Sequence, residues 1–148
     1  MSETIVITAR DAKAYLARIR KTDGLVGRLC DLRLSLRSSL YSARSGLGGM
    51  PGGKADPDRI GSVVARLDAL ERKIDDAVDE LTAQKDDAFD RIRRIADPDE
   101  QAVLIARYLQ LRSWRRIAMD MHMDERTVYR LHGRALSSFA EKMSVSGS

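Results

Sequence analysis

Side chains suited to reading DNA bases are concentrated in residues 113–136, towards the C-terminus. Arg126 and Arg130 stand four residues apart, so on a helix they share one face. Each guanidinium can donate two hydrogen bonds to O6 and N7 of guanine. Glu125 can accept from a cytosine amine, and Tyr129 can reach a phosphate or pack on a thymine methyl. The chemistry indicated is recognition of double-stranded DNA.

A second set of side chains suits the phosphate backbone, where contacts fix the register of a protein without reading sequence. The residues expected to make these contacts are Ser113, Arg115, Arg116, Thr127 and Arg134. The alternative is a solvated basic face on an ordinary helical bundle, because helix pairs joined by short turns are common. The apolar pattern, the capping residue and the basic outer face agree with one another, which favours the DNA-binding interpretation.

A helix-turn-helix is predicted to position these side chains, with its second helix over residues 124–136 in the major groove. Asp124 is expected to cap that helix, and the small side chain of Ala118 lets the two helices cross closely. The inner face should consist of Ile117, Ala118, Met121, Met123, Val128, Leu131 and Ala135.

The stretch IARYLQLRSWRRIAMDMHMDERTVYRLHGRAL resembles the DNA-binding region 4 of bacterial sigma factors. The whole layout resembles the ArpU/RinA-type phage and prophage transcriptional regulators, and the match covers residues 98–136. The resemblance implies an N-terminal helical part, a helix-turn-helix near the C-terminus, and activation of late or packaging genes through DNA binding. The matching positions are Trp114, Ile117, Ala118, Val128, Tyr129, Arg130, Leu131, His132, Ala135 and Leu136.

One residue departs from the family pattern. His122 stands where such motifs usually have glycine, because the turn needs a positive φ. Histidine is among the more tolerant non-glycine residues in that conformation, so we expect the turn to form with some strain.

The rest of the chain predicts an all-α protein. Two long helices, about residues 8–45 and 56–95, are expected to form an antiparallel hairpin across the glycine-rich linker 46–55. Start signals precede three helices: Thr8 with Asp11, Asp56 before Pro57, and Asp97 before Pro98. The expected domains are the hairpin (1–95), the helix-turn-helix domain (96–143) and a frayed tail (144–148), with a third helix reaching Leu111.

We predict that oligomerisation occurs through the hairpin, which would form the contacts between subunits. Leucines recur at spacings of three and four in the first helix, and the second has a near-heptad apolar seam interrupted by Glu71 and Lys85. Residues 1–45 carry nine basic and four acidic side chains, and residues 58–90 carry five and ten, so opposite charges should face each other. Gly24 and Gly27 are expected to weaken the first helix, which would allow a kink or a break near Asp23 and Gly24.

Two helices alone cannot bury apolar residues that lie on two sides of a helix. A homodimer that forms a four-helix bundle is therefore the favoured arrangement. Such a dimer should recognise two half-sites related by dyad symmetry. A monomer whose hairpin folds back over the C-terminal domain is the alternative. The hairpin is also a candidate site for holding RNA polymerase.

Nothing in the sequence predicts an enzyme, a cofactor or a metal site. The glycine-rich GLGGMPGG lacks the strand and the Gly-Lys-Ser/Thr ending of a phosphate loop, and the two histidines have no third ligand at metal spacing. The single cysteine, Cys30, excludes an intrachain disulfide and favours a reducing compartment. No apolar run approaches the roughly 20 residues that span a bilayer, so a cytoplasmic protein without membrane contact is expected.

Two other functions are compatible with the same pattern. A small terminase-like DNA-packaging oligomer would use the helix-turn-helix for looser binding and would form a closed ring of subunits. A helical adaptor would bind a protein through its hairpin and would show no salt-dependent affinity for DNA.

Overall fold

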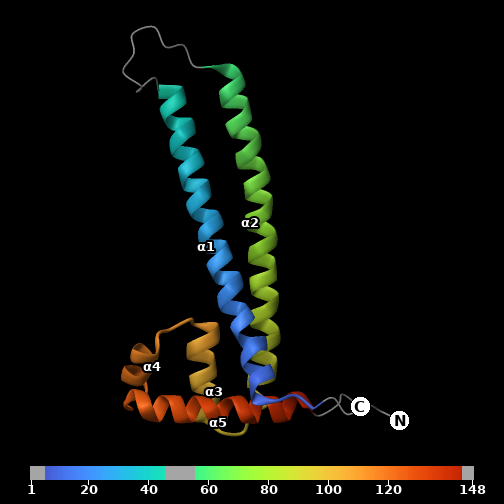
Figure 1. Cartoon of the computed structure of the whole chain (residues 1–148), viewed down its shortest axis with the longest axis vertical. Coiled ribbons are helices and arrows are strands. Elements are labelled where there is room, and N and C mark those ends of the chain that lie inside the picture. Colours follow the sequence, from blue (N-terminus) through green and yellow to red (C-terminus); the bar gives the residue numbers. More distant parts are fainter. Residues whose placement is uncertain (1–5, 46–55, 145–148) are drawn as a thin grey trace, which may run out of the picture. The chain divides into compact units, whose positions relative to one another are not determined.

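The computed structural model describes residues 6–45 and 56–144, and in this part of the chain every regular element is helical (Figure 1). The all-α expectation is therefore confirmed. The linker expected over 46–55 and residues 145–148 of the expected tail lie outside the described residues. The elements are α1 (Ala9–Ser45), α2 (Pro57–Ile92), α3 (Pro98–Leu104), the π-helical turn η1 (Ile105–Leu109), α4 (Trp114–Asp120) and α5 (Glu125–Ser144).

The expected start signals are formed. The Thr8 N–H donates to Asp11 Oδ2 at 3.0 Å and the Asp11 N–H donates to Thr8 Oγ1 at 3.2 Å, which is a capping box at the start of α1. The hydrogen bonds that the Thr8 backbone N–H and then the Thr8 hydroxyl donate to the Asp11 carboxylate lower the pKa of Asp11. Asp56 Oδ1 accepts from the Asp58 N–H at 3.0 Å, and Asp97 Oδ1 accepts from the Asp99 N–H at 2.8 Å. Aspartate caps thus fix where α2 and α3 begin.

Helices α1 and α2 pack against each other as the predicted antiparallel hairpin (Figure 1). The weak point at Asp23 and Gly24 does not break the helix, because α1 is helical through both residues and through Gly27. Each glycine costs about 1 kcal/mol relative to alanine, which a long cooperative helix tolerates.

Three helix ends differ from expectation. The second long helix ends at Ile92, not at residue 95, and Ile95 is buried in the turn that follows. The third helix does not continue to Leu111, because its last turn is π-helical and Leu111 has a φ of 56°. The last helix continues past 136 to Ser144, since Phe139 and Ala140 are also buried and extend its inner face.

The chain divides into two compact units. Unit 1 consists of the described parts of Met1–Lys21 and Leu81–Ser148, and unit 2 is Thr22–Glu80. The division expected at residue 95 follows chain order, whereas this one groups the first turns of α1 with the C-terminal helices. Each unit is described below by itself.

Unit 1 holds the hydrophobic core. The first turns of α1 contribute three residues without exposed surface, and the end of α2 contributes Ala88 and Ile92. The Ile7 N–H donates to Ser144 Oγ at 2.8 Å, so the segment before α1 is held to the end of α5. The core residues with no exposed surface are Ala12, Leu16, Ile19, Ala88, Ile92, Val103, Leu104, Ile117, Val128, Ala135 and Phe139.

The described part of unit 2 buries few apolar residues. Its buried apolar residues, Leu70, Ile74 and Ala77, all lie on α2. The Glu71 carboxylate forms ion pairs with Arg33 at 3.2 Å and with Arg37 at 3.1 Å. These pairs confirm that the basic flank of α1 meets the acidic flank of α2 in this unit. Because exposed ion pairs contribute little, apolar contacts supply most of the stability of this unit.

Candidate nucleic-acid interface

Helices α4 and α5 form the predicted helix-turn-helix. Ser113 caps α4 by accepting from the Arg116 N–H at 3.2 Å, and Asp124 caps α5 by accepting from the Thr127 N–H at 2.7 Å. The side-chain and then the backbone hydrogen bond of Thr127 lower the pKa of Asp124. In the turn, His122 has a φ of 55°, the left-handed conformation expected where related motifs have glycine.

The inner face of the motif is packed as the sequence predicts. Ile117 and Val128 have no exposed surface, and Ala118 is 5% exposed. Met121 and Met123 are half-buried against the same core. The Met123 N–H donates to the Ala118 carbonyl at 3.0 Å, which closes the turn over the alanine. Helix α5 is therefore fixed from inside, and its outward side chains project from a packed element.

All nine predicted contact residues are exposed. Two of them also have structural roles: Ser113 caps α4, and Arg116 forms an ion pair with Asp120 at 3.1 Å. Within residues 6–45 and 56–144, no ion pair involves Arg115, Arg126, Arg130 or Arg134. In the described part of the chain these four guanidinium groups thus have no carboxylate within ion-pair distance.

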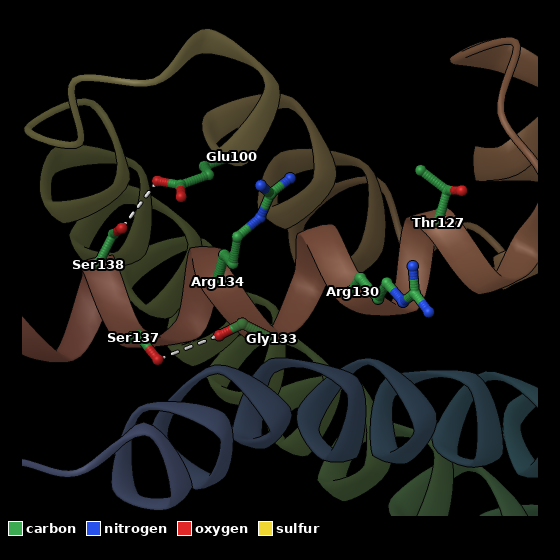
Figure 2. A pocket seen from close by; sticks show the side chains of 7 residues that line it. All are labelled: Glu100, Thr127, Arg130, Gly133, Arg134, Ser137 and Ser138. Carbon is green, nitrogen blue, oxygen red and sulfur yellow. Dashed lines mark hydrogen bonds between the residues drawn. The ribbon is translucent and has the colours of Figure 1, made fainter.

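On one flank of α5 the outward residues line an open groove against α3 (Figure 2). Arg130 and Arg134 project from successive turns. Ser138 Oγ donates to Glu100 Oε2 at 2.7 Å, and this contact joins α5 to α3. The lining residues are Glu100, Thr127, Arg130, Gly133, Arg134, Ser137 and Ser138. Sequence reasoning missed Glu100, Ser137 and Ser138, although Ser137 and Ser138 continue the spacing of Arg130 and Arg134 along the helix.

The other flank of α5 carries an aromatic cluster. Trp114 lies edge-on to Tyr129, with ring centroids 5.1 Å apart, and to His132 at 4.6 Å. The Arg107 guanidinium stacks 4.3 Å from the centroid of Trp114. Trp114 therefore joins the exposed Tyr129 to the buried part of the motif, a role that the sequence did not predict for it.

His132 is structural. It is 7% exposed, and its Nε2 lies 2.7 Å from the Tyr108 hydroxyl oxygen. Burial, followed by the positive charges of Lys13 and Arg107, lowers the pKa of His132 to about 4. Burial also raises the pKa of Tyr108. The pair is therefore neutral at physiological pH, which suits a buried hydrogen bond.

This pKa predicts a loss of stability in acid. The unfolded chain binds a proton at His132 below about pH 6.5, whereas the folded chain does so only near pH 4. The free energy of unfolding should therefore fall as the pH drops from 6.5 to 4, beyond the part due to carboxylates. Melting temperatures at pH 7 and pH 4.5 should differ less in His132→Gln than in the unaltered protein. An equal difference in both would contradict this assignment.

Two general features bear on the kind of site. Among residues 6–45 and 56–144, no group of three His, Cys, Asp or Glu side chains could hold a metal ion. In the same residues no helix has the length and apolar character that crossing a membrane requires.

Residues 31–144 match the family described as "Protein of unknown function (DUF722)". The chain belongs to this family. No curated protein and no solved structure matches it. The DUF722 match covers most of the chain and includes every candidate contact residue, from Ser113 to Arg134. Because the description of the DUF722 family gives no activity, a function must be argued from the geometry of the site.

Proposed function

We propose that this protein is a sequence-specific DNA-binding transcriptional regulator of the phage or prophage ArpU/RinA type. The N-terminal turns of α5, within residues 124–136, would lie in the major groove. The observation that carries the proposal is the outer face of α5, where exposed arginines without an ion-pair partner among the described residues project from a helix fixed by a buried inner face. Charged groups of this kind have no ion pair to break before they bind an anionic partner.

We assign the reading of DNA bases to the outermost residues of α5. Arg126 and Arg130 are exposed and four residues apart, and Glu125 precedes them in the first turn. The two flanks of α5 would meet the two phosphate strands that border the groove. Thr127 and Arg134 lie on the flank with the groove, and Tyr129 lies on the flank with Trp114.

The proposal includes no catalytic step and no cofactor. A regulator of this kind acts on DNA in the cytoplasm, which is the location that we propose. Contact with RNA polymerase is an additional proposal for unit 2, where exposed apolar residues are available.

Binding to unrelated duplexes at several salt concentrations tests the proposal. Fluorescence anisotropy with a labelled duplex should show an affinity that falls linearly with the logarithm of salt concentration. The slope should be about −0.9 for each phosphate neutralised. A helical adaptor would not bind DNA even at low salt, and that result would exclude a DNA-binding regulator.

We also propose that unit 2 forms a homodimer. Leu25 is 43% exposed and Leu32 is 55% exposed, and their spacing of seven places them on one face of α1. Leu29 and Leu36, both half-buried, continue the same heptad pattern. This apolar stripe on a basic helix suits a second copy, because the acidic α2 of that copy offers complementary charge.

Leu32→Glu should convert the dimer into a monomer, because it places a charge within the apolar stripe. Leu34→Glu is the matched control, since Leu34 is 67% exposed but lies two residues away, on the opposite side of α1. Light scattering coupled to size-exclusion chromatography reports the mass. A monomeric unaltered protein, or an unchanged dimer in Leu32→Glu, would contradict the proposed interface. A closed ring of many subunits would favour the terminase-like function.

A further inference from the structure

The first turns of α1 present two different flanks in unit 1. Ala12, Leu16 and Ile19 form the buried inner stripe. On one side of it, Arg18 pairs with Asp87 of α2 at 3.6 Å and stacks 4.1 Å from the ring centroid of Tyr15. That flank is therefore occupied by contacts with α2.

The other flank carries Lys13 and Arg20. The two residues are seven apart and so share a face, and Arg20 lies about 200° around the helix from Arg18. Both are exposed. No ion pair involves Lys13 or Arg20 within the residues that the structure describes. Two cations thus lie on a flank that the contacts with α2 leave open.

The first turns of α1 belong to the same compact unit as the proposed recognition surface, and the ring centroid of Tyr15 lies 5.8 Å from that of Phe139 of α5. The charge of Lys13 acts on His132 of α5, and that of Arg20 acts on Tyr108 and Arg107. Burial, followed by repulsion from Arg20, lowers the pKa of Arg107.

The positive charge is continuous with the recognition helix through an aromatic bridge. Arg107 stacks on Trp114, and Trp114 contacts Tyr129, which is 48% exposed on α5. The surface therefore runs from Arg20 on α1 to the side of α5 opposite the groove of Figure 2. A duplex that receives α5 in its major groove must place one phosphate strand on each of these sides.

We propose that Lys13 and Arg20 bind phosphates of the DNA strand that borders the Tyr129 side of α5, so that α1 adds a backbone contact to the helix-turn-helix. This inference rests on the proposed function. The ligand class is the phosphodiester backbone of duplex DNA. Contacts of this kind position the protein on the duplex and carry no sequence information.

The test replaces both residues with glutamine, which removes the charge and keeps a good helix former. The Lys13→Gln/Arg20→Gln protein should bind every duplex more weakly by the same factor. Its salt slope should be smaller by about 2, because each replaced cation leaves one phosphate without a protein charge beside it. Lys142→Gln is the control, because Lys142 is exposed in the last turn of α5, about 20 Å along the helix from Tyr129.

The outcomes separate this inference from the proposed function. If the unaltered protein does not bind DNA, both the proposed function and the α1 contact are contradicted. If Arg134→Ala weakens DNA binding but the double variant keeps the full salt slope, the α1 contact alone is contradicted. An equal effect of Lys142→Gln would show that net charge acts without a local contact, and would also overturn it. Melting temperatures should stay unchanged, since both replaced side chains are exposed.

Discussion

Phe139→Ala should destabilise the protein by about 3–5 kcal/mol, the usual cost of removing a buried aromatic ring. Phe139 has no exposed surface and is among the largest fully buried side chains. Its ring centroid lies 5.8 Å from that of Tyr15, so it packs the end of α5 against the first turns of α1. The substitution leaves a cavity where these two helices meet in unit 1.

Chemical denaturation followed by circular dichroism measures the change. Phe89→Ala is the matched control, because Phe89 is 48% exposed and its loss should cost much less. Similar losses in the two variants would contradict the packing described for Phe139. The destabilised protein should also bind DNA more weakly at temperatures near its melting point, since the recognition helix is part of the same core.

Arg130→Ala should weaken binding to the preferred DNA site by about 1–3 kcal/mol, or about 5- to 150-fold, and relax the preference at one position. Arg130 is exposed on the outer face of α5, four residues after Arg126. A guanidinium at that place can donate to both acceptors of a guanine. Loss of both hydrogen bonds removes the discrimination together with the affinity.

Arg134→Ala is the matched comparison, because Arg134 lines the same groove one turn further along α5. It should weaken binding to all sequences by one factor and reduce the salt slope by about 1. Competition between the preferred duplex and variants at each position distinguishes the two effects. A uniform loss for Arg130→Ala would make it a phosphate contact, and the groove of Figure 2 would then hold backbone alone.

Much of the fold is local enough to be predicted from the sequence. The capping residues Thr8, Asp56, Asp97 and Asp124 each act within three residues, so their patterns can be recognised without tertiary information. The inner face of the helix-turn-helix was also predictable. Its positions follow the helical period, and the positive φ of His122 follows from the geometry of the turn.

The features that were missed depend on contacts between distant residues. Helix α5 continues past 136 because Phe139 packs on Tyr15, more than a hundred residues earlier. Glu100 enters the groove only because α3 lies against α5, where Ser138 donates to it. No periodicity places the first turns of α1 in the same unit as α5.

The candidate contact residues were chosen by type and spacing, and all are exposed, while their contact with DNA stays a prediction. The sequence could not show that Arg116 pairs with Asp120, since such a pair depends on the rotamers of both side chains. It also could not show that Trp114 joins Tyr129 to Arg107, because η1 and α4 meet through a tertiary contact.

Selection of bound duplexes from a random DNA pool tests sequence-specific recognition most directly. The purified protein should enrich an inverted repeat whose half-sites are related by a dyad, as a dimer carrying two recognition helices requires. A single asymmetric motif would keep the recognition helix but contradict the dimer on DNA. No enrichment, even at low salt, would contradict the central claim that the outer face of α5 reads DNA.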